Sequence, residues 1–213
     1  HSMMCSSVCA ISTTTGSVGI AGIAVRATAD TSGDEGLSTA RFCAVVLSPS
    51  MLKRDWPQAE WTARTEAELD NLRAAIAAAL SGVAEPVLAV KFAVALQGFW
   101  TLRGRSSEGR AVVREALALA EVQALDIAKA WALYVGAALA DNQSDYAEAR
   151  RMLEECLALR RGIGQPVEVA ATLSTLALAR LHLGDAEGAR ADETEALQLF
   201  QQAGDRYGEA ISG

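Results

Sequence analysis

Apolar positions after Pro57 recur at the spacing of an α-helix. In "SDYAEARRMLEECLALR", residues 144–160, small or apolar side chains stand at 149, 153, 156 and 157, and the stem of Arg160 continues the same helical face. A second apolar stripe runs along "DIAKAWALYVGAALA", residues 126–140, and the polar stretch "DNQSD" separates the two. This pattern predicts two antiparallel helices joined by a tight turn.

The helix pair is written three times with a spacing of 40 residues. Close copies of 144–160 stand at 104–120 ("GRSSEGRAVVREALALA") and 184–200 ("GDAEGARADETEALQLF"). Such a period is typical of a solenoid, in which each hairpin covers the apolar flank that its neighbour exposes. We therefore predict repeats at about 85–123, 124–163 and 164–203, with the start of a further one at 204–213. Seven columns stay aligned: 109/149/189, 110/150/190, 115/155/195, 116/156/196, 117/157/197, 119/159/199 and 130/170/210.

Small residues and glycines refine this prediction. The column Gly109, Ala149 and Ala189 marks where two helices approach closely, so a large side chain there would overpack the interface. Glycines at 162, 164 and 204 are expected to supply the left-handed conformation that ends a helix.

The first quarter of the chain has a different texture. Residues 1–37 are rich in Ser, Thr and Gly and show no helical period, which leaves disorder, a strand or two, or a remnant of another domain as alternatives. Residues 38–56 contain the apolar run "ARFCAVVL" and are interpreted as a linker or short helix. The helical array is expected to occupy 57–213.

The repeats resemble the tetratricopeptide family. "SDYAEARRMLEECLAL" is similar to the second helix of that motif, with Tyr146, Ala149 and Cys156 at the preferred aromatic, Ala and Ala positions. "ATLSTLALARLHLGDAEGA", residues 171–189, resembles the first helix and turn. Glu193 and Gln97 depart from the motif, which prefers an apolar and a small residue there. The resemblance implies an all-α fold, a right-handed α-α superhelix of antiparallel helical hairpins.

A second resemblance lies upstream of the repeats. "QAEWTARTEAELDNLRAAIAAAL", residues 58–80, and "LQGFWTLRGRSSEGR", residues 96–110, look like a junction in multidomain bacterial signal-transduction ATPases that regulate transcription. There, this stretch connects a nucleotide-binding and winged-helix part to the repeat array. The resemblance implies that the chain is a fragment of such a cytoplasmic regulator, corresponding to its sensor part.

Composition narrows the classes of function. The 213 residues carry a net charge of −7, which argues against direct binding to nucleic acid because phosphates are held by clustered Lys and Arg. The four cysteines form no CxxC pair, and His182 is the only histidine after position 1, so neither a disulfide scaffold nor a metal site is expected. Cys156 aligns with Ala116 and Ala196 and is interpreted as a small buried residue. No run of about 18 apolar residues suggests a membrane span.

Reactive groups that would indicate an enzyme are not gathered in the sequence. "TGSVGIAG", residues 15–22, has glycines like those of a phosphate-binding loop but lacks the GK[ST] ending that places a Lys on the phosphates. We therefore expect no catalysis and no cofactor. A nucleotide-linked enzyme fragment remains the weakest of three alternatives.

The leading hypothesis is a module that binds a protein segment or small effector. In the tetratricopeptide fold the first helices line the concave face, and the 40-residue register then assigns six residues to it: Lys91, Trp131, Tyr134, Asn142, Ser174 and His182. Trp131 packing between hairpins is an equally weighted alternative, whereas Phe99 and Trp100 are expected in the core. The structural alternative is self-association through the ends of the solenoid, which would give a homodimer.

Overall fold

Helices dominate the part of the chain that the structure describes. This computed structural model describes residues 24–27, 42–46 and 58–204, and the chain divides into two compact units, His1–Ala67 and Glu68–Gly213. The repeat region therefore belongs to a unit that begins at Glu68 rather than at the predicted residue 57. The segments 15–22 and 205–213, on which two predictions fall, lie outside the described residues.

The described residues of the first unit form a pair of strands and one helix. Strand β1 (Ala24–Ala27) pairs antiparallel with strand β2 (Phe42–Val46), and helix α1 spans Gln58–Ala67. The prediction of a linker or short helix over 38–56 is wrong at β2. Its sequence, FCAVV, combines an aromatic with β-branched residues, which favour a strand once a partner strand is present. One of the alternatives left open for 1–37, a strand, is realised at β1.

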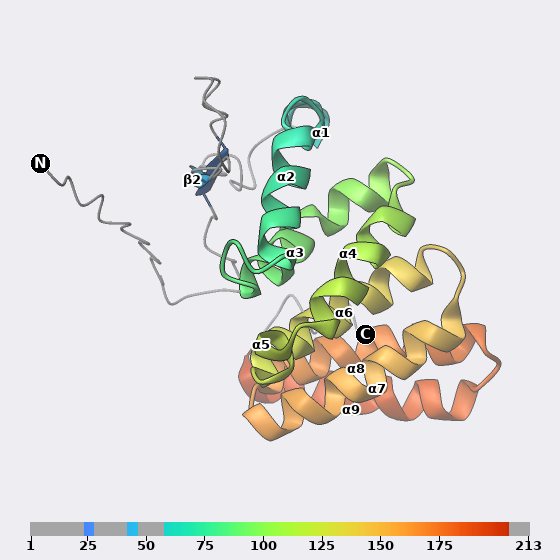
Figure 1. Ribbon diagram of the computed structural model, residues 1–213. Helices are drawn as coiled ribbons and strands as arrows, with labels where there is room; N and C mark the ends of the chain where they lie inside the picture. The colour runs from blue at the N-terminus through green and yellow to red at the C-terminus, as the bar shows by residue number, and fades with distance from the viewer. Residues whose placement is uncertain (1–23, 28–41, 47–57, 205–213) are drawn as a thin grey trace, which may run out of the picture. The chain divides into compact units, whose positions relative to one another are not determined.

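The second unit is all-α over its described residues, 68–204. Its helices form three successive antiparallel pairs, α3–α4, α6–α7 and α8–α9, with α2 before the first pair and the short α5 after it (Figure 1). The pairs lie within the three predicted repeat ranges. The helix bounds are α2 Leu69–Leu80, α3 Val87–Leu102, α4 Ser106–Ala118, α5 Ala120–Gln123, α6 Asp126–Asp141, α7 Tyr146–Ile163, α8 Pro166–His182 and α9 Ala186–Ala203.

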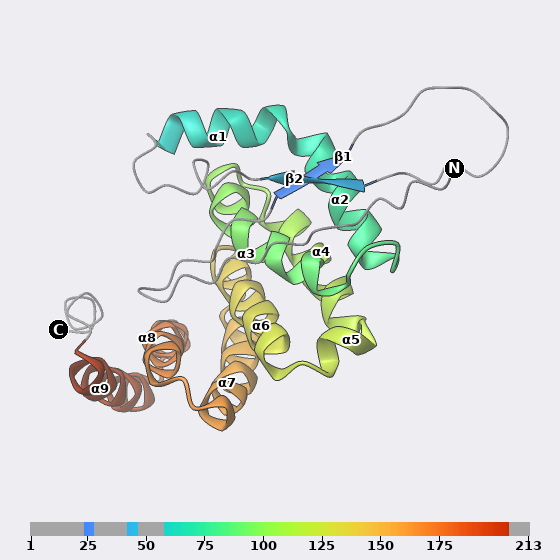
Figure 2. The same cartoon turned by 90° about the vertical axis from the view of Figure 1, so that its left-hand side faces the viewer.

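Each helix pair packs on the next one in sequence. Helix α6 contacts both α3 and α4, and α8 contacts α7 and, to a smaller extent, α6 (Figure 2). The aligned column Ala116, Cys156 and Ala196 is completely buried. Phe99 and Trp100 are also in the core, as predicted. No helix within the described residues is both long and apolar enough to cross a lipid bilayer.

The turn inside each pair is the same in all three copies. Gly104, Ser144 and Gly184, spaced by 40 residues, have φ angles of 65°, 61° and 83°. In each copy the next residue's N–H donates to a carbonyl five residues earlier, as from Asp145 to Ala140 and from Asp185 to Arg180, both at 2.9 Å. Only the middle turn uses a residue with a Cβ, for which this conformation is unfavourable.

Glycines at the helix ends follow the sequence prediction in two of three cases. Gly164 and Gly204 end α7 and α9 with φ of 79° and 67°. The prediction for Gly162 is wrong, because this residue lies inside α7. The helix continues to Ile163, and the next residue, Gly164, forms its C-terminal cap.

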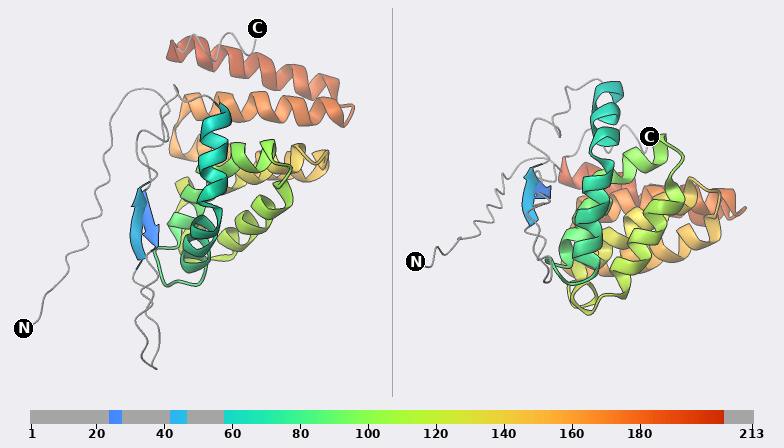
Figure 3. Two further views of the ribbon diagram at one scale, coloured as in Figure 1. Left: turned by 90° about the horizontal axis from the view of Figure 1, so that it is seen from above. Right: turned by 45° about the horizontal axis from the view of Figure 1, so that its top comes forward.

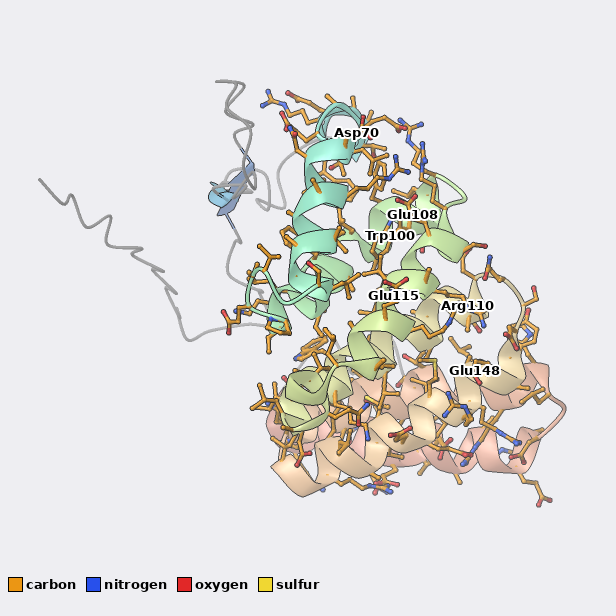
Figure 4. All side chains as sticks on the ribbon, viewed as in Figure 1. Asp70, Trp100, Glu108, Arg110, Glu115 and Glu148 are labelled. Carbon is orange, nitrogen blue, oxygen red and sulfur yellow. The ribbon has the colours of Figure 1, made fainter. Side chains whose placement is uncertain are left out.

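Arginine–carboxylate pairs connect successive parts of the second unit. Arg73 of α2 donates to both carboxylate oxygens of Glu108 in α4 at 2.7 and 3.0 Å, which lowers the pKa of Glu108. Figure 4 labels Glu108 and Arg110, both on α4. Arg110 of α4 donates to Asp145 at 2.7 Å and likewise lowers its pKa. Arg161 of α7 pairs with Glu195 of α9 at 2.5 Å. Ion pairs at the surface therefore connect each helix pair to the next.

The substitution Gly109→Ala should lower the free energy of unfolding by about 1–3 kcal/mol. A Cβ at Gly109 would lie 2.8 Å from Trp100 Cδ2 and 2.7 Å from Leu139 Cδ1, and the indole has no room to withdraw because it is buried. Urea denaturation measures the change. The control is Gly98→Ala, a helical glycine with open space around its Cβ position, which should be stabilising. Equal effects of the two substitutions would contradict the close approach.

The substitution Ser144→Gly should raise the free energy of unfolding by about 0.5–1 kcal/mol, because glycine adopts a positive φ without steric cost. The reciprocal control is Gly184→Ser. Its Cβ position is also open, so that change should destabilise by a similar amount through the backbone alone. Thermal unfolding of both variants measures the difference. Shifts of the same sign would show that the two turns are not equivalent.

Candidate functional site

The six residues predicted to bind a ligand are spread over the first helix of each pair. Lys91 is on α3, Trp131 and Tyr134 are on α6, Asn142 follows α6, and Ser174 and His182 are on α8. We call the surface formed by these residues of α3, α6 and α8 the first-helix surface. It is continuous in sequence register, with 91 aligned to 131, 134 to 174 and 142 to 182. The structure brings only some of these side chains into contact.

Trp131 and Tyr134 form the centre of this surface. Their ring centroids are 6.2 Å apart at an angle of 85°, an edge-to-face arrangement that is favourable for aromatic pairs. Both rings are half-buried. The Tyr134 hydroxyl is 3.2 Å from the Thr175 hydroxyl on α8, so the aromatic pair is also connected to the next helix pair.

A buried arginine lies against both rings. The guanidinium carbon of Arg160 is 4.7 Å from the Trp131 ring centroid and 4.6 Å from that of Tyr134, within the range of cation–π attraction. The residue is only 2% exposed. It comes from the last turn of α7, where a cation is also favoured by the helix dipole.

Two hydrogen bonds also fix the Arg160 guanidinium. Arg160 Nη1 donates to the Glu168 carbonyl at 2.9 Å and to Thr172 Oγ1 at 2.7 Å, whereas Nη2 is buried with no hydrogen-bond partner within the described residues. A buried cation without a carboxylate is costly unless its surroundings are polarisable. The faces of the Trp131 and Tyr134 rings supply that environment here. The same contacts therefore stabilise both the buried guanidinium and the positions of the two rings.

A cavity of about 500 Å³ opens beside Tyr134. Tyr134 of α6 lines it together with residues of α8 and α9. Its walls are largely apolar, with hydroxyl groups from α8 and one carboxylate. The lining residues are Tyr134, Ala171, Ser174, Thr175, Ala177, Leu178, Leu181, Ala189, Glu193 and Phe200.

The other predicted residues lie away from this centre. His182 stacks on Tyr146 of α7, with centroids 4.1 Å apart and planes within 10°. Asn142 is exposed at the C-terminal end of α6. Lys91 is half-buried on α3 and makes no hydrogen bond or ion pair with another described residue. Of the six, only Trp131, Tyr134 and Ser174 lie around the arginine and the cavity.

Burial raises the pKa of two titratable groups, Cys156 and Asp192. Cys156 is buried as predicted, its Sγ donates to the Ala130 carbonyl at 3.2 Å, and burial raises the pKa of its thiol. Burial also raises the pKa of Asp192, against the opposing effect of Arg180, which lies 2.9 Å away. The described residues contain no group of three or more His, Cys, Asp or Glu positioned to hold a metal ion.

Sequence reasoning missed two residues that shape the site. Arg160 was assigned only as a stem on the apolar face, although a lone arginine in a buried register position signals a specific partner. Thr175 gave no signal, because a hydroxyl in a helix interior usually bonds its own backbone, as this one also does with Ala171 O at 2.9 Å. Its contact with Tyr134 depends on how the pairs stack.

Comparison with known proteins adds no family. No protein-family model matches the chain, and no curated protein matches it significantly.

The substitution Arg160→Lys should lower the free energy of unfolding by about 1–3 kcal/mol. An ammonium cannot face two perpendicular rings while it donates to both Glu168 O and Thr172 Oγ1. The matched control is Arg161→Lys at the next position, where the side chain is 50% exposed and the effect should stay within about 0.5 kcal/mol. Urea denaturation of both variants measures the two changes in the free energy of unfolding. Equal effects would contradict a specific role of the buried guanidinium.

Proposed function

We propose that the second unit is a tetratricopeptide-like right-handed solenoid that binds a protein segment without catalysis. Support comes from the three helix pairs in 40-residue register and from their identical turns at Gly104, Ser144 and Gly184. Each pair packs on the next, as a solenoid requires, and Gly109 of α4 lies against Leu139 of α6. Under this proposal the first-helix surface is the concave face.

The cavity beside Tyr134 is the observation that carries the proposal. It is concave and mainly apolar, and a few hydroxyls converge on it from Ser174 and Thr175, which is the usual composition of a ligand site. Leu178 and Leu181 at its rim are 58% and 57% exposed, so apolar area remains available to a ligand. A side chain of a bound segment would fill the cavity.

The rings beside the cavity add a platform of fixed orientation. Arg160 contacts both rings and Thr175 contacts the Tyr134 hydroxyl, so little side-chain entropy is lost when a ligand packs on Trp131 and Tyr134. Aromatic side chains of this kind carry much of the energy at protein interfaces. A peptide that crosses from α6 to α8 would contact both the rings and the cavity.

A role within a larger regulator follows from the junction-like sequence at 58–80. We propose that the module is the sensor part of a bacterial signal-transduction ATPase that regulates transcription, and that a bound protein segment or small effector biases other domains of that protein. This part of the proposal is based on sequence resemblance alone. Self-association through the ends of the solenoid is the competing proposal.

Selection of a displayed peptide library against the intact chain, followed by titration, tests binding at the first-helix surface. Trp131→Ala should weaken a selected peptide by about tenfold or more, as expected for a central aromatic anchor, and Lys91→Ala should weaken it less. The control is Gln198→Ala on the exposed face of α9. Peptides that bind all variants equally would remove this surface from consideration.

A further inference from the structure

Four columns of the 40-residue register form one face of the first helix in each pair. They begin at Val87, Lys91, Val94 and Gly98 of α3 and recur 40 and 80 residues later in α6 and α8, a spacing that keeps them on one side of a helix. Every position in these columns is exposed or half-buried. Figure 3 shows the three pairs in succession, and α6 contacts both α3 and α8. We call these positions the first-helix columns.

Charged side chains are almost absent from the first-helix columns. Lys91 is the single charged residue in them, although charged residues make up 21% of the chain and favour exposed positions. Helix α3 contains no other charged residue. An exposed face made otherwise of apolar, small and hydroxyl side chains is typical of a surface that a partner covers.

The ammonium of Lys91 is not neutralised within the described residues. Its side chain is half-buried and makes no hydrogen bond or ion pair there. Lys129 of α6 is half-buried as well, but its ammonium lies 2.7 Å from Glu155 Oε1. The exposed carboxylates of Glu85 and Asp126 belong to positions outside the columns. A half-buried cation has lost part of its hydration, so a carboxylate supplied by a ligand would stabilise it.

Lys91 and Trp131 occupy the same column on neighbouring helices. The axes of packed helices are about 8–10 Å apart, and alternate side chains of an extended chain project from one face about 7 Å apart. Because Lys and Trp have long side chains, one extended segment can contact both with residues two positions apart. A Cβ at Gly98 would meet no atom within 4 Å, so there is room for the backbone of such a segment beside α3.

We infer that the first-helix columns of α3 and α6 recognise an extended segment of a partner protein in which an acidic residue stands two positions from an apolar one. The acidic side chain pairs with the Lys91 ammonium, and the apolar side chain packs on the Trp131 ring. The inference rests on the proposed function, because it specifies the chemistry of the segment that binds the first-helix surface. It adds α3 to the site, which contributes no residue to the cavity beside Tyr134.

Three displayed peptide libraries test the inference with the intact chain. Each has Glu, Gln or Lys fixed at the central position and uncharged residues elsewhere. The Glu library should give the tightest binders, with an apolar residue enriched two positions from Glu. The best peptide is then synthesised with blocked termini and titrated by fluorescence anisotropy. Replacing its Glu by Gln should weaken binding about fivefold at low salt and less at high salt.

Variants at position 91 assign the preference to one side chain. Lys91→Gln should abolish the difference between the Glu and Gln peptides, and Lys91→Glu should make the Lys version of the peptide bind more tightly than the Glu version. The matched control is Lys129→Gln, which removes the same charge from α6 two residues before Trp131. It should leave the difference unchanged within about twofold.

The inference and the proposed function fail in different ways. Equal binding of the Glu and Gln peptides, or an undiminished difference in Lys91→Gln, would overturn the inference, and weaker binding by Trp131→Ala would then leave the proposed function standing. Loss of the difference in Lys129→Gln would assign the preference to the overall field of the chain rather than to Lys91. Binding that requires a free C-terminal carboxylate in place of Glu would also overturn it. No binder from any library, or equal binding by Trp131→Ala, would remove both proposals.

Discussion

Close approach between helices at small residues is the constraint on which the second unit depends. The Trp100 and Leu139 side chains pack directly against the backbone of Gly109. Seven residues later, Ala116 is completely buried, and so are its equivalents in the next two repeats, Cys156 and Ala196. Because a helix pair has apolar residues on both flanks, it is stable only when a neighbour covers them. Small side chains allow that neighbour to come near enough for dense packing. The alignment of these positions at 40-residue intervals makes the same contact available three times.

Arg160 is the exception to this packing of small and apolar residues. Its register partners are Ala120 and Phe200, so a cation stands in a column whose last member is aromatic. Its charge is balanced by two ring faces, a carbonyl and a hydroxyl rather than by a carboxylate. The arrangement orders Trp131 and Tyr134 at the surface of the middle pair. The contacts that stabilise the buried charge of Arg160 therefore also fix the orientation of the two aromatic rings.

Helix pairing was readable from the sequence because it depends on local periodicity. The apolar face through Ala149, Leu153 and Cys156 is buried as predicted, and helix ends at Gly164 and Gly204 follow from the conformation that glycine permits. Strand β2 was missed because a five-residue apolar run has no period that distinguishes strand from helix, and its partner lies in a separate segment.

The candidate site was predictable only in part for a related reason. Trp131 and Tyr134 are three residues apart on one helix, so their contact follows from helix geometry. The contacts of Tyr134 with Thr175 and of Arg160 with Thr172 join different helix pairs. They depend on the rotation of one pair on the next, which a single sequence does not specify. Ser144 was hidden because serine in a polar turn gives no sign of a positive φ.

Nearest-neighbour packing has a consequence for how the second unit opens. Helix α9 packs chiefly against α8, whereas α6 is covered by α3, α4 and α7. Amide protons should therefore exchange with solvent soonest in α9 and latest in α6, with the aromatic platform on the slow side of this gradient. Opening of α9 alone would leave the platform's contacts in place, whereas separation of α8 would remove the hydrogen bonds of Tyr134 with Thr175 and of Arg160 with Thr172.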